Sequence, residues 1–355
     1  MRQTAAPTVS AVGRALPRHH LGQEELIVAL RGLWGARHFN VERLEDLQRA
    51  VQVSGRYLAL PLEGYRALDT FAKCNDAYIA AAQELGATAL LAALERASLP
   101  PEAVDHLFFV TVTGIATPSI DARLSNRLCM KPSMKRTPIF GLGCVAGAAG
   151  AARAADYLRA FPGEVAVLLS VELCSLTLQR EDLSIANIVA SGLFGDGAAA
   201  VVLEGADRPA KGPRIVATRS VFYPDSERVM GWDLVDSGFK VVLSAKVPEI
   251  VRAHVARDVD AFLASEGLAR RDIRHFIAHT GGPKVLEAFE DALALPKGAL
   301  ARSWRSLREV GNLSSASVLF VLEDLLASGE ARPGDLGLLL AMGPGFCAEL
   351  LLLAW

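Results

Sequence analysis

Two stretches of the chain repeat one pattern at a shift of 169 positions. Residues 94–111 read LERASLPPEAVDHLFFVT, and residues 263–280 read LASEGLARRDIRHFIAHT. Each stretch has a helical segment, a turn, a charged residue, a histidine and an apolar strand, in that order. The two stretches share four identities: Leu94 and Leu263, Leu99 and Leu268, His106 and His275, and Thr111 and Thr280.

A second match follows at almost the same shift. At 168 positions, Cys144 falls on Asn312, and each follows a glycine and precedes a helix of small residues (VAGAAGAA and LSSASVLF). Self-similarity at a fixed shift indicates an internal duplication. We therefore expect two similar halves packed into one globule, residues 1–210 and residues 211–355.

Apolar segments of strand length alternate with segments of helical periodicity, which predicts an α/β fold with buried sheets. Helices are expected at residues 83–98, 120–129, 145–161, 247–264, 284–292 and 314–326. Strands are expected at residues 106–113, 137–140, 164–171, 198–203, 275–279, 336–342 and 348–353. Ligands of such folds bind at the carboxyl ends of the strands, so a seam between the two halves is the expected site.

Composition and charge exclude several classes of protein. Apolar residues make up 51% of the chain, enough for a large core, and the net charge of -2 argues against a nucleic-acid partner. The five cysteines form no CxxC pair, which favours reduced thiols over a disulfide scaffold. No apolar run reaches the ~18 residues of a membrane span, and residues 13–20 are too polar for a signal peptide. The expected location is the cytoplasm.

Cys144 is the strongest candidate for a nucleophile. It follows Gly141 and Gly143 at the expected start of a helix, where glycines permit a tight turn between strand and helix. The positive end of a helix favours a thiolate. A small buried thiol with no chemical role fits the same position about equally well.

His279 and Asn312 are the other two candidates. His279 ends an apolar strand and precedes Gly281-Gly282, where an imidazole could act as a base or as a hydrogen-bond donor. Asn312 is either a helix N-cap or an amide donor to an oxyanion. Each taken alone is more simply a structural residue.

The GLGCVAG segment resembles a dinucleotide fingerprint only in part. Its third glycine comes one position late, and no acidic residue follows at a strand end ~20 residues on. The chain has no GxxxxGK[ST], HExxH or GxSxG motif. Phosphate-loop, zincin and serine-hydrolase chemistries therefore lack support.

Five segments taken together resemble the type III polyketide synthases, the chalcone and stilbene synthase-like enzymes of the thiolase fold. They are RTPIFGLGCVAGAAG, GLFGDGAAAVVL, IAHTGGPKVL, VGNLSSASVLF and GPGF, in that order along the chain. The resemblance runs from about Arg56 to the C-terminus. It implies a duplicated, five-layered αβαβα fold. It also implies that Cys144, His279 and Asn312 form a catalytic triad, the cysteine in the first half and the other two in the second.

The resemblance implies a mechanism as well. A Cys144 thiolate, stabilised by the helix start and by an imidazolium at His279, would take the starter from an acyl-CoA as a thioester. Malonyl-CoA would lose carbon dioxide, and His279 with Asn312 would donate to its enolate, which attacks the thioester. The implied enzyme is a homodimer that uses CoA thioesters and no metal or redox cofactor.

Further site residues follow from the same resemblance. Phe194 matches a gatekeeper between the CoA tunnel and the cavity, and the second gatekeeper phenylalanine falls on Val241, which suggests a wider cavity. Three more residues match positions that line the cavity or reach the partner's cavity: Cys174, Thr177 and Thr117. Arg56 is a candidate for contacts with the CoA phosphates, and a solvated surface arginine fits the same position equally well.

The sequence therefore predicts a type III polyketide synthase. Smaller aliphatic residues in the cavity favour a fatty-acyl starter and alkylpyrone or alkylresorcinol products. One alternative is a ketoacyl-ACP synthase III-like enzyme, which has the same triad but takes its substrate from a carrier protein. The other is a catalytically dead, acyl-binding relative.

Overall fold

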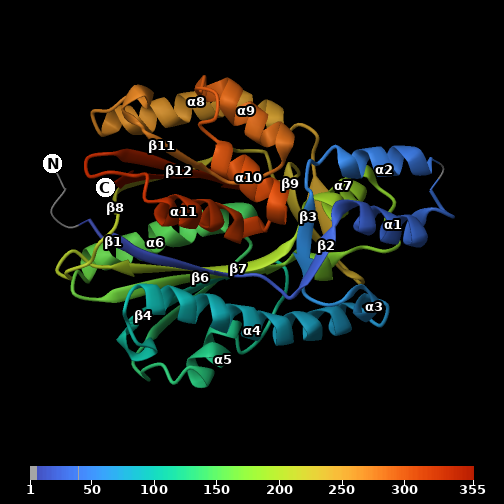
Figure 1. The fold of residues 1–355 in the computed structure, drawn as a ribbon, viewed down its shortest axis with the longest axis horizontal. Helices are drawn as coiled ribbons and strands as arrows, with labels where there is room; N and C mark the ends of the chain where they lie inside the picture. The colour runs from blue at the N-terminus through green and yellow to red at the C-terminus, as the bar shows by residue number, and fades with distance from the viewer. Residues whose placement is uncertain (1–5, 39) are drawn as a thin grey trace.

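The computed structural model describes residues 6–38 and 40–355, and Figure 1 shows them stacked as five layers. Two outer layers of helices enclose two sheet layers, and a layer of helices lies between the sheets. This is the α/β architecture that the sequence predicts.

Nine strands form the two sheet layers, in the order β11-β12-β13-β8-β1-β7-β6-β4-β5. The first half supplies β1 (Thr8–Ala15), β4 (His106–Thr111), β5 (Lys135–Phe140), β6 (Val165–Leu173) and β7 (Asp196–Glu204). The second half supplies β8 (Arg214–Phe222), β11 (His275–Ala278), β12 (Leu336–Gly343) and β13 (Cys347–Ala354). The single pair Thr8 and Arg214 joins the two sets.

The two halves use the same pairing pattern. In the first, β4 is parallel to β6, and β7 lies antiparallel between β6 and β1. In the second, β11 is parallel to β12, and β13 lies antiparallel between β12 and β8. The repeated histidines His106 and His275 therefore begin equivalent strands, in agreement with an internal duplication.

Three layers consist of helices. One outer layer contains α4 (Phe71–Arg96) and α5 (Ile120–Arg127), and the other contains α8 (Val247–Ser265) and α9 (Pro283–Leu293). Between the sheets lie α6 (Ala146–Ala160) and α11 (Ser317–Ser328), with α10 (Ala301–Val310) beside α11.

Close packing explains the small residues of α6. Most of its alanines and glycines are buried, and a Cβ atom on Gly147 would lie 2.1 Å from the carbonyl oxygen of Ser315. The residues before α11 therefore pack directly on the backbone of α6. Only glycine permits this approach, which brings the two equivalent helix starts together.

The remaining elements form a lobe at one end of the layers (Figure 1). They are β2 (His19–Gly22), α1 (Gln23–Trp34), α2 (Val41–Arg49), β3 (Gly55–Leu58), α3 (Leu62–Tyr65), α7 (Ile185–Leu193), β9 (Met230–Val235) and β10 (Gly238–Leu243).

One helix, α4, is long and apolar enough to cross a membrane by length and composition alone. It packs against β1, β7 and β6, and half of its most apolar window is buried. Its apolar residues thus serve the core. The expected helix at residues 83–98 is the second half of α4.

Candidate active site

Cys144 lies in a short 3-10 turn, η3 (Gly143–Val145), between β5 and α6. Gly143 has φ +52°, and a Cβ atom there would lie 2.8 Å from the Pro344 ring. Glycine is therefore required for the turn that presents the thiol. The thiol is almost fully buried, with 5% of the residue exposed.

The environment of Cys144 keeps its thiol protonated. Burial raises its pKa to about 12, although hydrogen bonding with Ser314 and Asn312 acts in the opposite direction. The sulfur lies 3.7 Å from the Ser314 hydroxyl oxygen. Desolvation thus outweighs the helix start, and the thiol needs a base before it can attack.

Asn312 is held by its side-chain oxygen. Its Oδ1 accepts from the Ser314 amide at 2.8 Å and from the Ser317 hydroxyl at 3.3 Å. Asn312 therefore does cap the following turn. The same bonds fix the orientation of its carboxamide and turn its Nδ2 group toward Cys144, where it can also donate to a ligand.

His279 follows β11, and its backbone amide donates to the Leu340 carbonyl at 2.9 Å. The residue is 3% exposed, and neither ring nitrogen has a hydrogen-bond partner within the described residues. Burial lowers its pKa to about 4. Burial thus favours the neutral imidazole in this structure, and the imidazolium expected beside a Cys144 thiolate stays a prediction.

Strand β12 connects the positions of these residues. It pairs with β11, and its last residue, Gly343, packs so closely on η3 that a Cβ atom there would lie 2.6 Å from the Val145 nitrogen. Cys144, Ser314 and Asn312 thus meet at the two helix starts. His279 lies at the end of the neighbouring strand.

A buried carboxyl group lies next to this centre and contacts it through Ser315. Glu172 accepts from the Val112 amide at 3.1 Å and the Thr113 hydroxyl at 2.9 Å, and also from the Ser315 hydroxyl. Burial raises its pKa to about 7. Our sequence reasoning missed Glu172, although a glutamate inside an otherwise apolar strand was a visible signal.

A cavity of about 30 Å³ lies at the thiol. Cys144, Ser314, Phe194, Trp232 and Val241 are among the residues that line it. A second cavity of about 190 Å³ shares Phe194, Trp232 and Val241 with the first. These three side chains therefore form the wall between an inner and an outer cavity.

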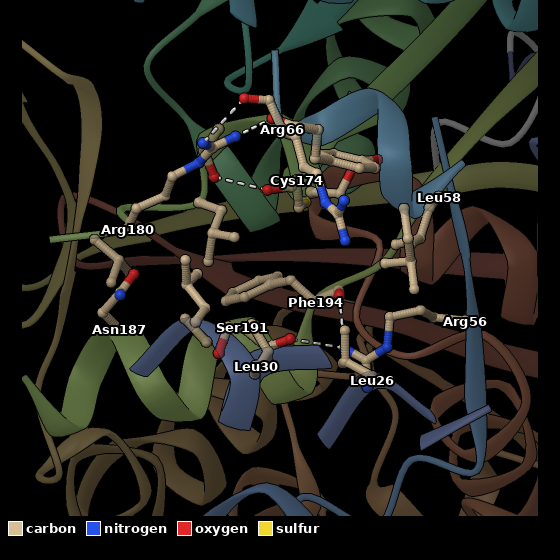
Figure 2. A pocket seen from close by; sticks show the side chains of 18 of the residues that line it. Leu26, Leu30, Arg56, Leu58, Arg66, Cys174, Arg180, Asn187, Ser191 and Phe194 are labelled. Atoms are coloured by element: carbon tan, nitrogen blue, oxygen red, sulfur yellow. Dashed lines mark hydrogen bonds between the residues drawn. The ribbon is translucent and has the colours of Figure 1, made fainter. Parts of the chain in front are cut away.

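The outer cavity contains both predicted lining residues, Cys174 and Thr177, and Figure 2 shows Cys174 across the cavity from Phe194. Val241, the second gatekeeper position, pairs across the β9–β10 hairpin with Trp232. Trp232 and Val241 both line this wall, and the expectation of a wider cavity stays a prediction. Our sequence reasoning missed Trp232.

Arg56 does not lie where a CoA phosphate could reach it. The residue is 1% exposed, and its guanidinium donates to the carbonyl oxygens of Ser191, Gly192 and Phe194 and to the Gln23 side chain. These acceptors occupy the guanidinium, as Figure 2 shows in part. The predicted phosphate contact is therefore withdrawn, and Arg56 instead anchors the segment before Phe194.

Two of the other cavities bear on the candidate residues, and Cys144 lines neither of them. One, of about 460 Å³, is lined by Thr117 together with Ile115 and Phe140, whose large apolar side chains are exposed. The other, of about 440 Å³, lies at the start of α9 and is lined by Gly281 and Lys284. Lys284 is exposed and directly follows the GGP segment, a signal that our sequence reasoning did not use.

This arrangement suits covalent acyl chemistry. A buried thiol can hold an acyl group as a thioester, and a neutral imidazole with a fixed carboxamide can donate to a developing oxyanion. The apolar cavity around them excludes water, which strengthens both donors.

Known proteins match the whole chain. The N-terminal domain of the chalcone and stilbene synthases matches residues 1–208, and their C-terminal domain matches residues 214–354. A 1,3,6,8-tetrahydroxynaphthalene synthase of Streptomyces peucetius subsp. caesius is 50% identical over 98% of this chain and 93% of its own. A putative chalcone synthase of Bacillus subtilis is 38% identical over 98% of both chains.

A solved structure shares the fold. The 1,3,6,8-tetrahydroxynaphthalene synthase of Streptomyces coelicolor A3(2), described as a bacterial type III polyketide synthase, superposes with a TM-score of 0.93. It is 30% identical, and the match covers 98% of this chain and 99% of that one.

Proposed function

The chain belongs to the chalcone and stilbene synthases, the type III polyketide synthases, and we propose that Cys144, His279 and Asn312 are its catalytic triad. The enzyme extends an acyl-CoA starter by iterative decarboxylative condensation with malonyl-CoA. Because the chain belongs to this family, we do not retain the alternative of a ketoacyl-ACP synthase III-like enzyme, which takes its substrate from a carrier protein. The convergence of the thiol of Cys144, the hydroxyl of Ser314 and the carboxamide of Asn312 beside an apolar cavity carries the proposal.

The first half-reaction loads the starter. His279, neutral because it is buried, takes the proton of the Cys144 thiol as the sulfur attacks the acyl-CoA carbonyl. CoA leaves with that proton as a thiol, and the acyl group stays on Cys144. A neutral base is needed here, because an isolated thiolate in this site is strongly disfavoured.

The second half-reaction forms the carbon–carbon bond. Malonyl-CoA loses carbon dioxide, and the electron pair of the broken bond passes to the thioester as an enolate. An N–H of His279 and the Nδ2 of Asn312 donate to the enolate oxygen. The enolate carbon attacks the Cys144 thioester and expels the sulfur, which takes up a proton from solvent and returns to the thiol. Carbon dioxide loss supplies the nucleophile, so we propose no cofactor beyond the CoA thioesters.

Intact-protein mass spectrometry tests the triad. With a starter acyl-CoA, the wild type and Cys129→Ser, whose cysteine is exposed, gain one acyl mass. Cys144→Ala gains none. Asn312→Ala is expected to load the starter but to lose malonyl-CoA decarboxylation. Acylation of Cys144→Ala at the wild-type rate would contradict the proposal.

The outer cavity favours an aliphatic starter, since Leu26, Leu30 and Leu58 line it. Alkylpyrones or alkylresorcinols are then the expected products. The relative that is 50% identical favours a second candidate product, 1,3,6,8-tetrahydroxynaphthalene. Incubation with labelled malonyl-CoA, with and without lauroyl-CoA, distinguishes them: the first candidate requires the acyl starter for product, and the second does not.

We propose that CoA reaches the thiol through the cavity beside Lys284, whose ammonium group would meet its phosphates. Lys284→Ala then raises the KM for malonyl-CoA without changing the acylated mass.

We also propose a homodimer through the exposed side chains around Thr117. Phe140→Asp is expected to give monomers in light scattering. Phe222→Asp, which changes an exposed phenylalanine elsewhere, is expected to leave the dimer intact.

The five unpaired cysteines agree with a cytoplasmic location.

A further inference from the structure

The outer cavity is a slot that runs from the wall of the thiol cavity to the surface of the lobe. Its inner end is the wall of Phe194, Trp232 and Val241. At its other end, Leu33 and Leu62 are more than a third exposed. An acyl chain that starts at Cys144 and passes this wall would therefore run between leucines toward solvent.

The charges along this slot have one sign. Its lining contains Arg56, Arg66 and Arg180 but no aspartate or glutamate. The guanidinium of Arg56 is occupied by carbonyl oxygens, and that of Arg180 donates to the carbonyls of Tyr65 and Arg66. Two of the three cations are thus already bound to the backbone.

Arg66 differs from the other two. No ion pair and no side-chain hydrogen bond of Arg66 occurs among residues 6–38 and 40–355. Figure 2 shows its side chain extending past Cys174 and Leu58 toward the middle of the cavity, while the head group of Arg180 turns back to the chain. The acidic residue Asp69, three positions on, pairs with Lys73. The cavity therefore presents one unpaired cation.

We infer that the outer cavity receives the far end of the acyl chain on Cys144 and that Arg66 binds a carboxylate at that end. The inference rests on the proposed thioester chemistry and names its substrate class: CoA monothioesters of dicarboxylic acids, with an apolar middle and an anionic end. Leucines contact the methylenes, and a guanidinium binds a carboxylate through two parallel hydrogen bonds.

The guanidinium of Arg66 would make the cavity distinguish acyl chains by the group at their far end. A plain alkyl end gains nothing from the guanidinium, which stays hydrated because Arg66 is exposed. A carboxylate end forms charge-assisted bonds with it, and these are stronger than neutral ones. The preference is expected to weaken as salt is added, because Arg66 is exposed.

The experiment compares two thioesters that differ only at the far end, octanoyl-CoA and suberyl-CoA, the monothioester of octanedioic acid. Acylation of Cys144 is followed by intact mass at equal concentrations. The wild type is expected to load suberyl about tenfold more efficiently. Arg66→Ala should lose this preference while loading octanoyl at the wild-type rate, and Arg66→Lys should keep part of it. Arg31→Ala, which removes an exposed arginine paired with Glu45 on the same lobe, should behave as the wild type.

Equal loading of the two thioesters by the wild type, or a preference that survives in Arg66→Ala, would overturn the inference and leave the proposed function intact. A separate result identifies failure of the function itself. If neither thioester acylates the wild type more than Cys144→Ala, both the function and the inference fall.

Discussion

Phe194 and Asn312 are joined as a parallel pair that holds the two halves of the chain together. The Asn312 amide donates to the Leu193 carbonyl at 2.9 Å, and the Gly195 amide donates to the Asn312 carbonyl at 3.0 Å. The proposed gate and the proposed enolate donor thus share one pair of backbone bonds. A shift of either segment would move the other.

Gly311→Ala is expected to uncouple this pair. Gly311 has φ +75°, and a Cβ atom there would lie 2.7 Å from the Leu193 oxygen. Gly267→Ala is a control for the positive φ alone, since Gly267 has φ +76° and nothing within 4 Å. Gly311 also has ψ -165°, a backbone region that essentially only glycine adopts, so Gly311→Ala adds this strain to the contact that displaces Asn312. Malonyl-CoA decarboxylation should fall about 10- to 100-fold in Gly311→Ala alone; equal rates in the two variants would contradict the coupling.

The reactivity of Cys144 should rise with pH throughout the neutral range. Burial raises the pKa of its thiol to about 12, so the thiolate fraction grows about tenfold per pH unit below that value. Iodoacetamide alkylation, measured in a Cys129→Ser background from pH 6 to pH 9, should therefore increase without reaching a plateau. A plateau below pH 7 would show a stable thiolate–imidazolium pair and contradict the neutral centre described above.

Arg56→Lys tests whether Arg56 is structural. Lysine keeps the charge but cannot reach the carbonyls of Ser191, Gly192 and Phe194 together, and it leaves an ammonium group buried. A loss of about 3 kcal/mol in the free energy of unfolding is expected, seen as a lower Tm. The KM for malonyl-CoA of the folded fraction should stay unchanged. A raised KM with a normal Tm would restore the phosphate role.

The sequence was informative where one period or one motif dominated. The buried strands β6 and β7 and the glycine turn at Cys144 were predicted because continuous apolar runs and helix-start glycines are local signals. The lobe was not predicted. Its helices α1, α2 and α7 and its β9–β10 hairpin are short, and although α2 and α7 are amphipathic, their positions are fixed by contacts with distant segments.

The candidate site also has features that the sequence predicted and features that it did not. The repeat placed Cys144 and Asn312 at equivalent helix starts, and the structure joins them through Ser314. Ionisation could not be predicted, because the pKa of a buried group depends on all its neighbours. The position of Arg56 also depends on long-range packing, since its acceptors lie about 135 residues away in the sequence.

Trp232 should limit the length of the product. It lines both the inner and the outer cavity and pairs across the hairpin with Val241. Trp232→Ala would widen the passage through this wall between the two cavities, so the growing chain could accept further malonyl units before it cyclises. Products measured by mass spectrometry should become heavier by one or more two-carbon units. Leu234→Ala, two residues along the same strand and 62% exposed, is the control and should leave the product unchanged. Because a looser hairpin alone would slow both variants without lengthening either product, an unchanged product mass in Trp232→Ala would show that chain length is set elsewhere.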